Sequence, residues 1–215
     1  MLSSQEFHAL CNQTDLKVLE ATASGPKIFE TPHGEIIKLF RRKKGFSSNR
    51  FNPYAHRFCH NVKRLNELGF VAPKINALQY CPELKIHLVY YNKIPGDSFN
   101  FLARNNNAEI LSAAISLVSN LHNKGVYFRA VHLGNLLQQA DGAIALIDVA
   151  DMKFKKNALS LFMRYRNLKH LFSYKDDCPL WSVSGMPYWL EYYGELSGLP
   201  SYQIAILRYY LSRYE

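Results

Sequence analysis

Residues 127–151 read YFRAVHLGNLLQQADGAIALIDVAD, and this stretch decides the fold. Asp141-Gly142 lies between two apolar runs, which is the strongest short-range signal for a β-hairpin. Asn135 stands just before the first predicted strand and Asp148 at the end of the second, so the hairpin would bring both side chains to one end. An amide oxygen and a carboxylate are ligands that Mg²⁺ accepts in proteins. A capping Asn and a turn Asp would give the same pattern.

In the remaining chain, the hydrophobic periodicity predicts short strands first and helices later. The predicted strands are 17–20, 27–31, 35–40, 75–79, 84–91, 136–139 and 143–149. The predicted helices are 3–11, 54–68, 99–104, 109–122, 159–172, 188–196 and 201–214. The segment Ile94-Pro95-Gly96-Asp97 interrupts the pattern as a hinge. The order predicts an α+β chain, with a small lobe at 1–92 built on a five-stranded antiparallel sheet and a mainly helical lobe at 93–215.

The composition indicates a folded chain with an anionic partner. Hydrophobic residues make up 48% and charged residues 20% of the 215 residues, which argues against disorder. The net charge of +9 suits an anionic membrane surface, a phosphorylated substrate or a nucleic acid. The densest basic run, residues 41–44, fits a solvated loop, or a phosphate or membrane contact. Nucleic-acid binding is not expected, because no aromatic-basic strand motif or recognition helix accompanies the charge.

The cysteines and the N-terminal residues point to a cytoplasmic protein. The four cysteines lie far apart with no C-x-x-C pair, so reduced thiols are expected. The opening MLSSQEFHAL has neither the basic nor the apolar part of a signal peptide. No apolar run approaches the roughly 18 residues that a membrane span requires.

Four features follow the order of the protein-kinase-like fold: a turn with Gly25 between the first two strands, Lys38 on the third, the hinge, and Asn135 with Asp148 across the hairpin. The chain therefore resembles protein kinases. Four segments narrow the resemblance to the lipopolysaccharide kinase (Kdo/WaaP-like) group, and within it to small bacterial members often labelled toluene-tolerance proteins. These segments are NPYAHRFCHNVKRLNELGFVAPKI (52–75), LHNKGVYFRAVHLGNLL (121–137), LIDVADMKF (146–154) and RYRNLKHLF (164–172).

The resemblance implies an enzyme that transfers the γ-phosphate of ATP to an inner-core sugar of lipopolysaccharide. It implies ATP and Mg²⁺ as cofactors, and an anionic glycolipid or inner-core sugar as partner. It also implies a cytoplasmic location in a Gram-negative bacterium, with peripheral contact to the inner membrane. The implied metal ligands are Asn135 and Asp148. The implied nucleotide-binding residues are Ser24, Gly25, Lys38 and Tyr91, with Tyr90 and Asn92 beside Tyr91.

The chain departs from the kinase pattern at the catalytic base. The loop motif H-R-D reads Phe128-Arg129-Ala130, so Ala130 replaces the carboxylate that accepts the proton of the substrate hydroxyl. His132 and Asp151 are the candidate substitutes. General-base catalysis contributes about 10²–10⁴-fold, so a slow kinase remains compatible with Ala130. The alternative is a pseudokinase that binds nucleotide or acts as a scaffold in envelope biogenesis.

Two further departures concern the partner of Lys38 and the residues after Asp148. Asn61 or His60 stands about where a kinase has the Glu that pairs with this Lys. The DFG-type segment reads Asp148-Val149-Ala150 and lacks the Gly.

Aromatic residues crowd the last third of the chain, and we expect most of them to form the core of the helical lobe. An amphipathic face that touches a membrane or a glycolipid is the alternative. The cations that would supply its charge are Arg164, Arg166, Lys169 and Arg208.

Overall fold

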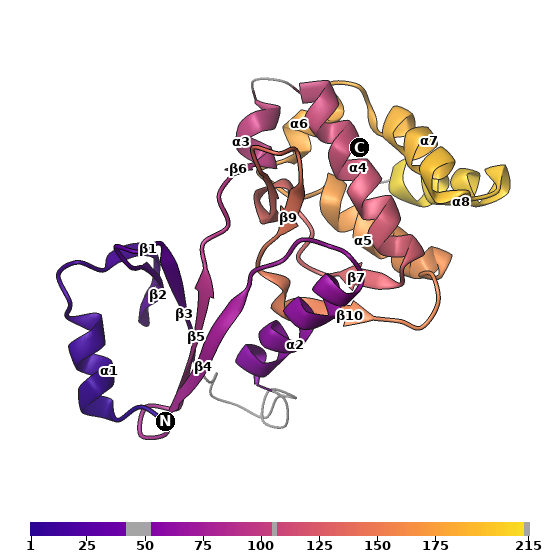
Figure 1. Ribbon diagram of the computed structural model, residues 1–215. Coiled ribbons are helices and arrows are strands. Elements are labelled where there is room, and N and C mark those ends of the chain that lie inside the picture. Colours follow the sequence, from indigo (N-terminus) through magenta and orange to yellow (C-terminus); the bar gives the residue numbers. More distant parts are fainter. Residues whose placement is uncertain (42–52, 105–106, 213–215) are drawn as a thin grey trace. The chain divides into compact units, whose positions relative to one another are not determined.

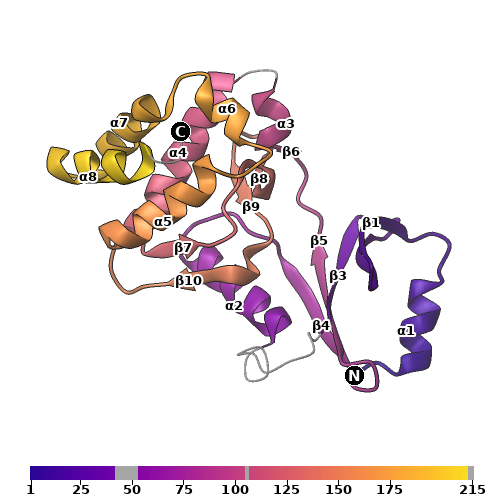
Figure 2. The same ribbon diagram turned by 180° about the vertical axis from the view of Figure 1, so that it is seen from behind.

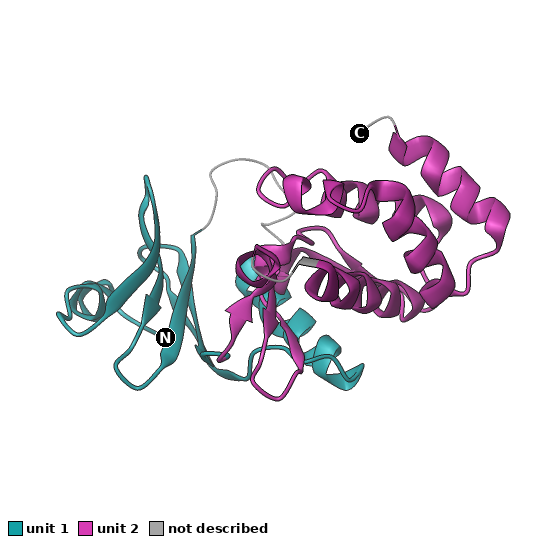
Figure 3. Ribbon diagram, turned by 90° about the horizontal axis from the view of Figure 1, so that it is seen from above, with its two compact units in different colours: residues 1–94 teal, residues 95–215 magenta. Residues whose placement is uncertain are grey.

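The computed structural model describes residues 1–41, 53–104 and 107–212 (Figure 1). The last three residues of the basic run 41–44 lie outside the described residues. The chain divides into two compact units, residues 1–94 and residues 95–215, which Figure 3 shows in different colours.

Unit 1 is built on a five-stranded antiparallel sheet in the order β1-β2-β3-β5-β4. Its strands are β1 (Lys17–Thr22), β2 (Gly25–Glu30), β3 (Glu35–Arg41), β4 (Ile75–Cys81) and β5 (Ile86–Asn92). All five were predicted, and their bounds differ from the prediction by one or two residues at one or both ends. The five-stranded antiparallel sheet that the sequence predicted is therefore confirmed.

Two helices accompany this sheet. Helix α1 (Ser4–Cys11) begins with a capping box, in which Ser3 and Glu6 each bond to the other's backbone N–H. Its Phe7 joins the sheet residues Phe29, Ile37 and Leu88 in one buried cluster. Helix α2 (Tyr54–Glu67) buries one stripe of side chains, namely Ala55, Phe58, Asn61, Val62 and Leu65.

Unit 2 is mainly helical. Its helices are α3 (Phe99–Ala103), α4 (Asn107–Asn123), α5 (Leu161–Phe172), α6 (Cys178–Ser182), α7 (Met186–Ser197) and α8 (Ser201–Leu211). Helix α4 packs against α3 and α7, and α5 packs against α8 (Figures 1 and 2). The predicted apolar face of α4 is buried, at Ile110, Ala114, Leu117, Val118 and Leu121. The sequence patterns did not predict α6, which has only five residues.

Unit 2 also holds two small antiparallel sheets. One has the order β6-β8-β9, formed by β6 (Asp97–Ser98), β8 (Leu136–Gln138) and β9 (Ile144–Leu146). The other pairs β7 (Val126–Phe128) with β10 (Met152–Phe154). Strands β6, β7 and β10 were not predicted, because runs of two or three residues are too short to show a period. Among the described residues, no helix is both long and apolar enough to cross a membrane.

Candidate functional site

The predicted hairpin is present, but its second strand ends early. Strands β8 and β9 pair with Leu136 opposite Leu146 and Leu137 opposite Ala145. Strand β9 ends at Leu146, whereas the pattern predicted an end at Val149. The reason is Asp148, whose backbone is left-handed (φ 53°, ψ 45°) and turns the chain into the 3₁₀ turn η3 (Val149–Asp151). An extended strand cannot continue through that conformation.

Asn135 is held at the start of this hairpin, at the end of the 3₁₀ turn η2 (Leu133–Asn135). The side chain is 7% exposed, and its Nδ2 donates a hydrogen bond to the carbonyl of Ala130 at 2.9 Å. That bond orients the amide, so its Oδ1 faces away from the Ala130 carbonyl as an available acceptor. The backbone carbonyl of Asn135 accepts a bond from the N–H of Ile147 at 3.1 Å, which places Asn135 beside Asp148.

Asp148 is one of two non-glycine residues with positive φ among the described residues; Lys85 is the other. A left-handed non-glycine residue costs about 1–3 kcal/mol and persists where the surrounding structure enforces it, often at a functional site. No group of three or more His, Cys, Asp or Glu side chains that could hold a metal occurs in the described part of the chain. Mg²⁺ usually takes one or two protein oxygens and otherwise binds water and phosphate. The pair of Asn135 and Asp148 fits that requirement.

His132 lies in the loop before Asn135 with its ring held on two sides. It stacks on Tyr174, with ring centroids 4.1 Å apart and planes 7° apart. On Gly134, an added Cβ would come within 3.1 Å of the His132 ring. Its Nδ1 is buried and has no hydrogen-bond partner among the described residues. Only Nε2 is therefore suited to take a proton from a substrate.

Burial and then the charge of His170 lower the pKa of His132, and the nearby Asp148 and Asp176 carboxylates act in the opposite direction. His132 is therefore neutral at pH 7 and can accept a proton there. The other predicted substitute base, Asp151, lies at the end of η3 and is partly exposed. A catalytic role for either residue stays a prediction.

The sequence reasoning missed Asp177, which is fully buried and holds the same loop. Its Oδ2 accepts a bond from the N–H of Leu133 at 2.6 Å, and its Oδ1 has no partner among the described residues. Burial raises the pKa of this carboxyl to about 6. A signal was present, because an Asp shortly before a Pro is typical of a helix start, and Asp177 stands at the N-cap of α6.

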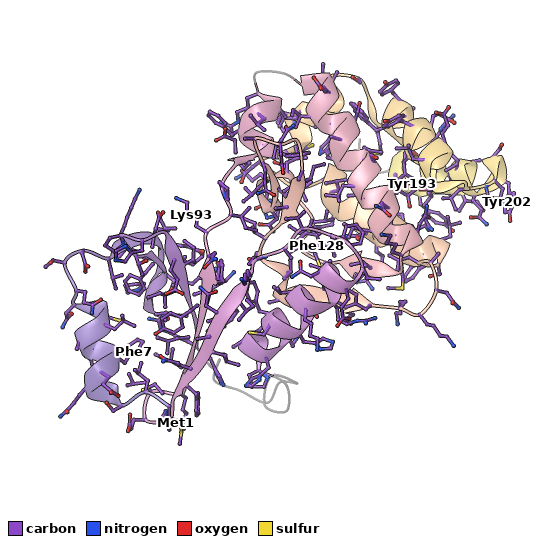
Figure 4. The ribbon with its side chains drawn as sticks, in the orientation of Figure 1. Met1, Phe7, Lys93, Phe128, Tyr193 and Tyr202 are labelled. Atoms are coloured by element: carbon purple, nitrogen blue, oxygen red, sulfur yellow. The ribbon has the colours of Figure 1, made fainter. Side chains whose placement is uncertain are left out.

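A buried polar network holds β7, the strand that leads into the loop. Asn167 on α5 donates from Nδ2 to the carbonyl of Phe128 at 2.6 Å, and its Oδ1 accepts from the N–H of Phe128 at 3.2 Å. Because Oδ1 is an acceptor, Nε2 of His122 must donate to it across 3.0 Å. Nδ1 of His122 then accepts from the hydroxyl of Tyr193 at 2.7 Å. Figure 4 labels Phe128 on β7 and Tyr193 on α7.

Arg164 completes this network and is not a surface cation, so that part of the prediction is wrong. It is 3% exposed and donates to the hydroxyl of Tyr193 at 2.8 Å, to the carbonyl of Leu159 at 2.9 Å and to the side chain of Asn123 at 2.8 Å. Burial lowers the pKa of His122 to about 3. The imidazole is therefore neutral, and the guanidinium of Arg164 carries the only charge in this network. Three oxygen atoms accept hydrogen bonds from the guanidinium and so compensate for its burial.

The predicted nucleotide-binding residues lie in unit 1. Lys38 is 4% exposed, and its Nζ lies 5.3 Å from the ring centroid of Phe58 and 5.6 Å from that of Phe40. Asn61 on α2 is also buried, whereas His60 is exposed. Lys38 therefore points into the apolar side of β3, which is the inward orientation that a functional role requires.

The turn that precedes β2 is short. Thr22 and Gly25 form the closing pair, and Ala23 and Ser24 form the turn between them. The N–H of Ser24 donates to Oγ1 of Thr22 at 3.3 Å, and Gly25 adopts φ +97°. On β5, the ring of Tyr91 lies 5.5 Å from that of Phe58. Nucleotide contacts of Ser24, Gly25 and Tyr91 stay predictions.

Comparison with known proteins supports the fold. No family model matches the chain, and no curated protein matches it. A co-crystal structure of WbdD with the kinase inhibitor LY294002 is 14% identical, with a TM-score of 0.51, over 87% of this chain and 43% of that chain. A structure of the bifunctional kinase-methyltransferase WbdD is 15% identical, with a TM-score of 0.53, over 87% of this chain and 42% of that chain.

The chain spans less than half of the length of each WbdD chain that it matches. At such low identity the likeness concerns the fold alone. The narrower resemblance to the lipopolysaccharide kinase group stays a prediction. The predicted fold is confirmed: the chain has a protein-kinase-like fold, with a five-stranded antiparallel sheet in unit 1 and a mainly helical unit 2.

Proposed function

We propose that this protein is an ATP-dependent phosphotransferase that phosphorylates an inner-core sugar of lipopolysaccharide. The observation that carries the proposal is the end of the β8–β9 hairpin. There Asn135 has its amide oxygen turned away from Ala130, next to an Asp148 held in a left-handed backbone. The kinase-like fold and the resemblance of four segments to lipopolysaccharide kinases support the substrate class.

The proposed roles of the residues follow from their chemistry. Bound ATP with Mg²⁺ would supply the γ-phosphoryl group, whose bond to the ADP oxygen breaks as a sugar hydroxyl oxygen bonds to phosphorus. Asn135 and Asp148 would hold the metal as oxygen ligands. Lys38 would contribute positive charge for the phosphates, and its burial removes competing water.

The proton of the sugar hydroxyl needs an acceptor, and Ala130 cannot provide one. Nε2 of His132 is the acceptor that we favour, because its ring is neutral at pH 7 and fixed by stacking on Tyr174. Without it the proton would leave to water, and the transfer would be slower by about 10²–10⁴-fold.

Ala130 also supports a second candidate, a pseudokinase that binds nucleotide or acts as a scaffold in envelope biogenesis. Both candidates place the protein in the cytoplasm, with peripheral contact to the inner membrane. They differ in turnover, and only the kinase requires nucleotide binding.

Transfer of labelled γ-phosphate from ATP to core oligosaccharide separates the two candidates. We expect slow, Mg²⁺-dependent labelling of the sugar by the unaltered protein, and no labelling by Asp148→Asn. His132→Gln should lower the rate and leave the affinity for ATP unchanged. Nucleotide binding without any transfer would support the pseudokinase, and the absence of nucleotide binding would refute both the kinase and the nucleotide-binding pseudokinase.

A further inference from the structure

Unit 2 contains a groove that the proposed nucleotide and metal residues do not use. Strand β7 and helix α5 are in contact (Figure 1). The groove lies along these two elements and has a volume of about 500 Å³. Its lining residues are Tyr127, Arg129, Phe162, Tyr165, Arg166, Lys169, His170 and Ser173. The volume falls within the range of roughly 300–1,000 Å³ that is usual for small-ligand sites.

The groove is strongly cationic. Three of the described residues that line it carry a positive charge, namely Arg129, Arg166 and Lys169, and none of them carries a carboxylate. Arg129 and Arg166 are exposed, so their guanidinium groups are accessible to a ligand. A planar guanidinium binds phosphate or carboxylate through two parallel hydrogen bonds, so the charge selects an anionic ligand.

Aromatic rings supply the rest of the lining. Phe162 is 65% exposed, which is unusual for a phenyl ring, and its centroid lies 5.8 Å from the guanidinium carbon of Arg166. Tyr165 continues the surface, with its ring centroid 6.4 Å from that of Phe162. Exposed ring faces beside cations suit a molecule with both an apolar face and an anionic group. A pyranose ring with an acidic substituent has this combination.

The groove adjoins the loop that carries Asn135. Arg129 directly precedes Ala130 in the sequence. On the other wall, the ring of His170 lies 5.9 Å from that of Tyr174, which in turn stacks on His132 at 4.1 Å. A ligand in this groove would therefore lie next to the residue that we favour as the proton acceptor.

We propose that this groove binds a saccharide carrying a phosphate or carboxylate group, and that Arg129 and Arg166 hold that group. In the proposed function this saccharide is the phosphoryl acceptor, so the identification as acceptor rests on that function. The binding itself does not depend on it. A concave site fits a soluble or extended saccharide better than the flat surface of a bilayer, whose lipid headgroups are the competing anionic ligand.

Binding without ATP tests the groove independently of catalysis. The probe is phosphorylated core oligosaccharide, titrated by calorimetry against the full chain, with neutral maltohexaose as the reference saccharide. We expect the core oligosaccharide to bind and the maltohexaose not to bind. Arg166→Gln and Arg129→Gln should each weaken binding by about tenfold or more, because each removes a charge-assisted hydrogen bond. Lys156→Gln is the matched control, since Lys156 is exposed in unit 2 and does not line the groove, and it should bind normally.

Three results would overturn the proposal: no binding of the core oligosaccharide, equal binding of maltohexaose, or normal binding by both arginine variants. Binding to phosphatidylglycerol vesicles that both arginine variants lose, with no binding of oligosaccharide, would also overturn it and would indicate a membrane contact. If the unaltered protein does not bind nucleotide and the oligosaccharide still binds, the groove stands and only the proposed function is refuted.

Discussion

The replacement Asp177→Asn tests how the loop that carries Asn135 is held. The carboxyl is fully buried, accepts one bond from Leu133, and has a pKa raised to about 6 from an ordinary value of 3.8. The charge of Asp176 raises this pKa further, and the charge of Arg104 lowers it. The amide of Asn keeps the acceptor for the N–H of Leu133 and removes the ionisation.

The sign of the pH effect follows from proton binding. Between pH 3.8 and about 6 the folded protein keeps the proton that the unfolded chain has already lost, so stability falls as the pH rises. A shift of this size costs about 3 kcal/mol once both states are ionised, at 1.36 kcal/mol per pKa unit. Between pH 4.5 and pH 8 the corresponding loss is about 2 kcal/mol.

Thermal or urea unfolding of both proteins at pH 4.5 and pH 8 measures this loss. We expect the free energy of unfolding of Asp177→Asn, relative to that of the unaltered protein, to be about 2 kcal/mol higher at pH 8 than at pH 4.5. This corresponds to a relative gain of roughly 4–8 °C in melting temperature. The amide N–H of the new Asn has no acceptor, but its cost in stability is the same at both pH values and cancels when the two stability differences are compared. The titration of His122 affects both proteins equally and cancels as well. A difference that does not change with pH would refute the reasoning, because it would mean that the carboxyl ionises normally.

Three further predictions concern the support of the loop. His122 has its pKa lowered to about 3 in the folded protein. As the pH falls, the unfolded chain therefore binds a proton at a higher pH than the folded protein does, and stability is lost. His122→Gln should therefore remove about 3 kcal/mol of the stability loss between pH 7.5 and pH 4.5 in urea unfolding, and an unchanged loss would contradict a neutral buried imidazole. Gly125→Ala should be strongly destabilising in thermal unfolding, because φ is +75° and the new Cβ would lie 2.5 Å from the carbonyl oxygen of Asn157; Gly142→Ala, at φ +84° with open space around it, is the matched control with a smaller loss. Gly134→Ala should shift the ring of His132 against Tyr174, because the new Cβ would lie 3.1 Å from it, and should therefore change the NMR chemical shifts of the imidazole, whereas unchanged shifts would mean that the ring does not rest on Gly134.

The local features of the fold could be predicted from the sequence because they depend on neighbouring residues. The Asp141-Gly142 turn and the buried face of α4 both arise within one short segment. The end of β9 could not be predicted, because Ile147 and Val149 continue an apolar run across Asp148. Only the left-handed backbone of Asp148 ends the strand, and no pattern in the residue types shows it.

The burial of polar residues was equally inaccessible to sequence patterns. Arg164 pairs with Tyr193 and Asn123, which are 29 and 41 positions away. Asp177 holds Leu133 across 44 positions. Such partners become known only when the helices are packed, so a charged residue on a helix was assigned to the surface by default.

The central claim is that Asn135 and Asp148 form a site for Mg²⁺ and nucleotide, and titration calorimetry with ATP tests it most directly. We predict that ATP binds in the presence of Mg²⁺, that binding weakens strongly without it, and that Asp148→Asn abolishes the Mg²⁺-dependent part. Asp141→Asn, at the exposed turn of the same hairpin, should bind ATP as the unaltered protein does. Absence of ATP binding, or binding that neither Mg²⁺ nor Asp148→Asn affects, would contradict the claim.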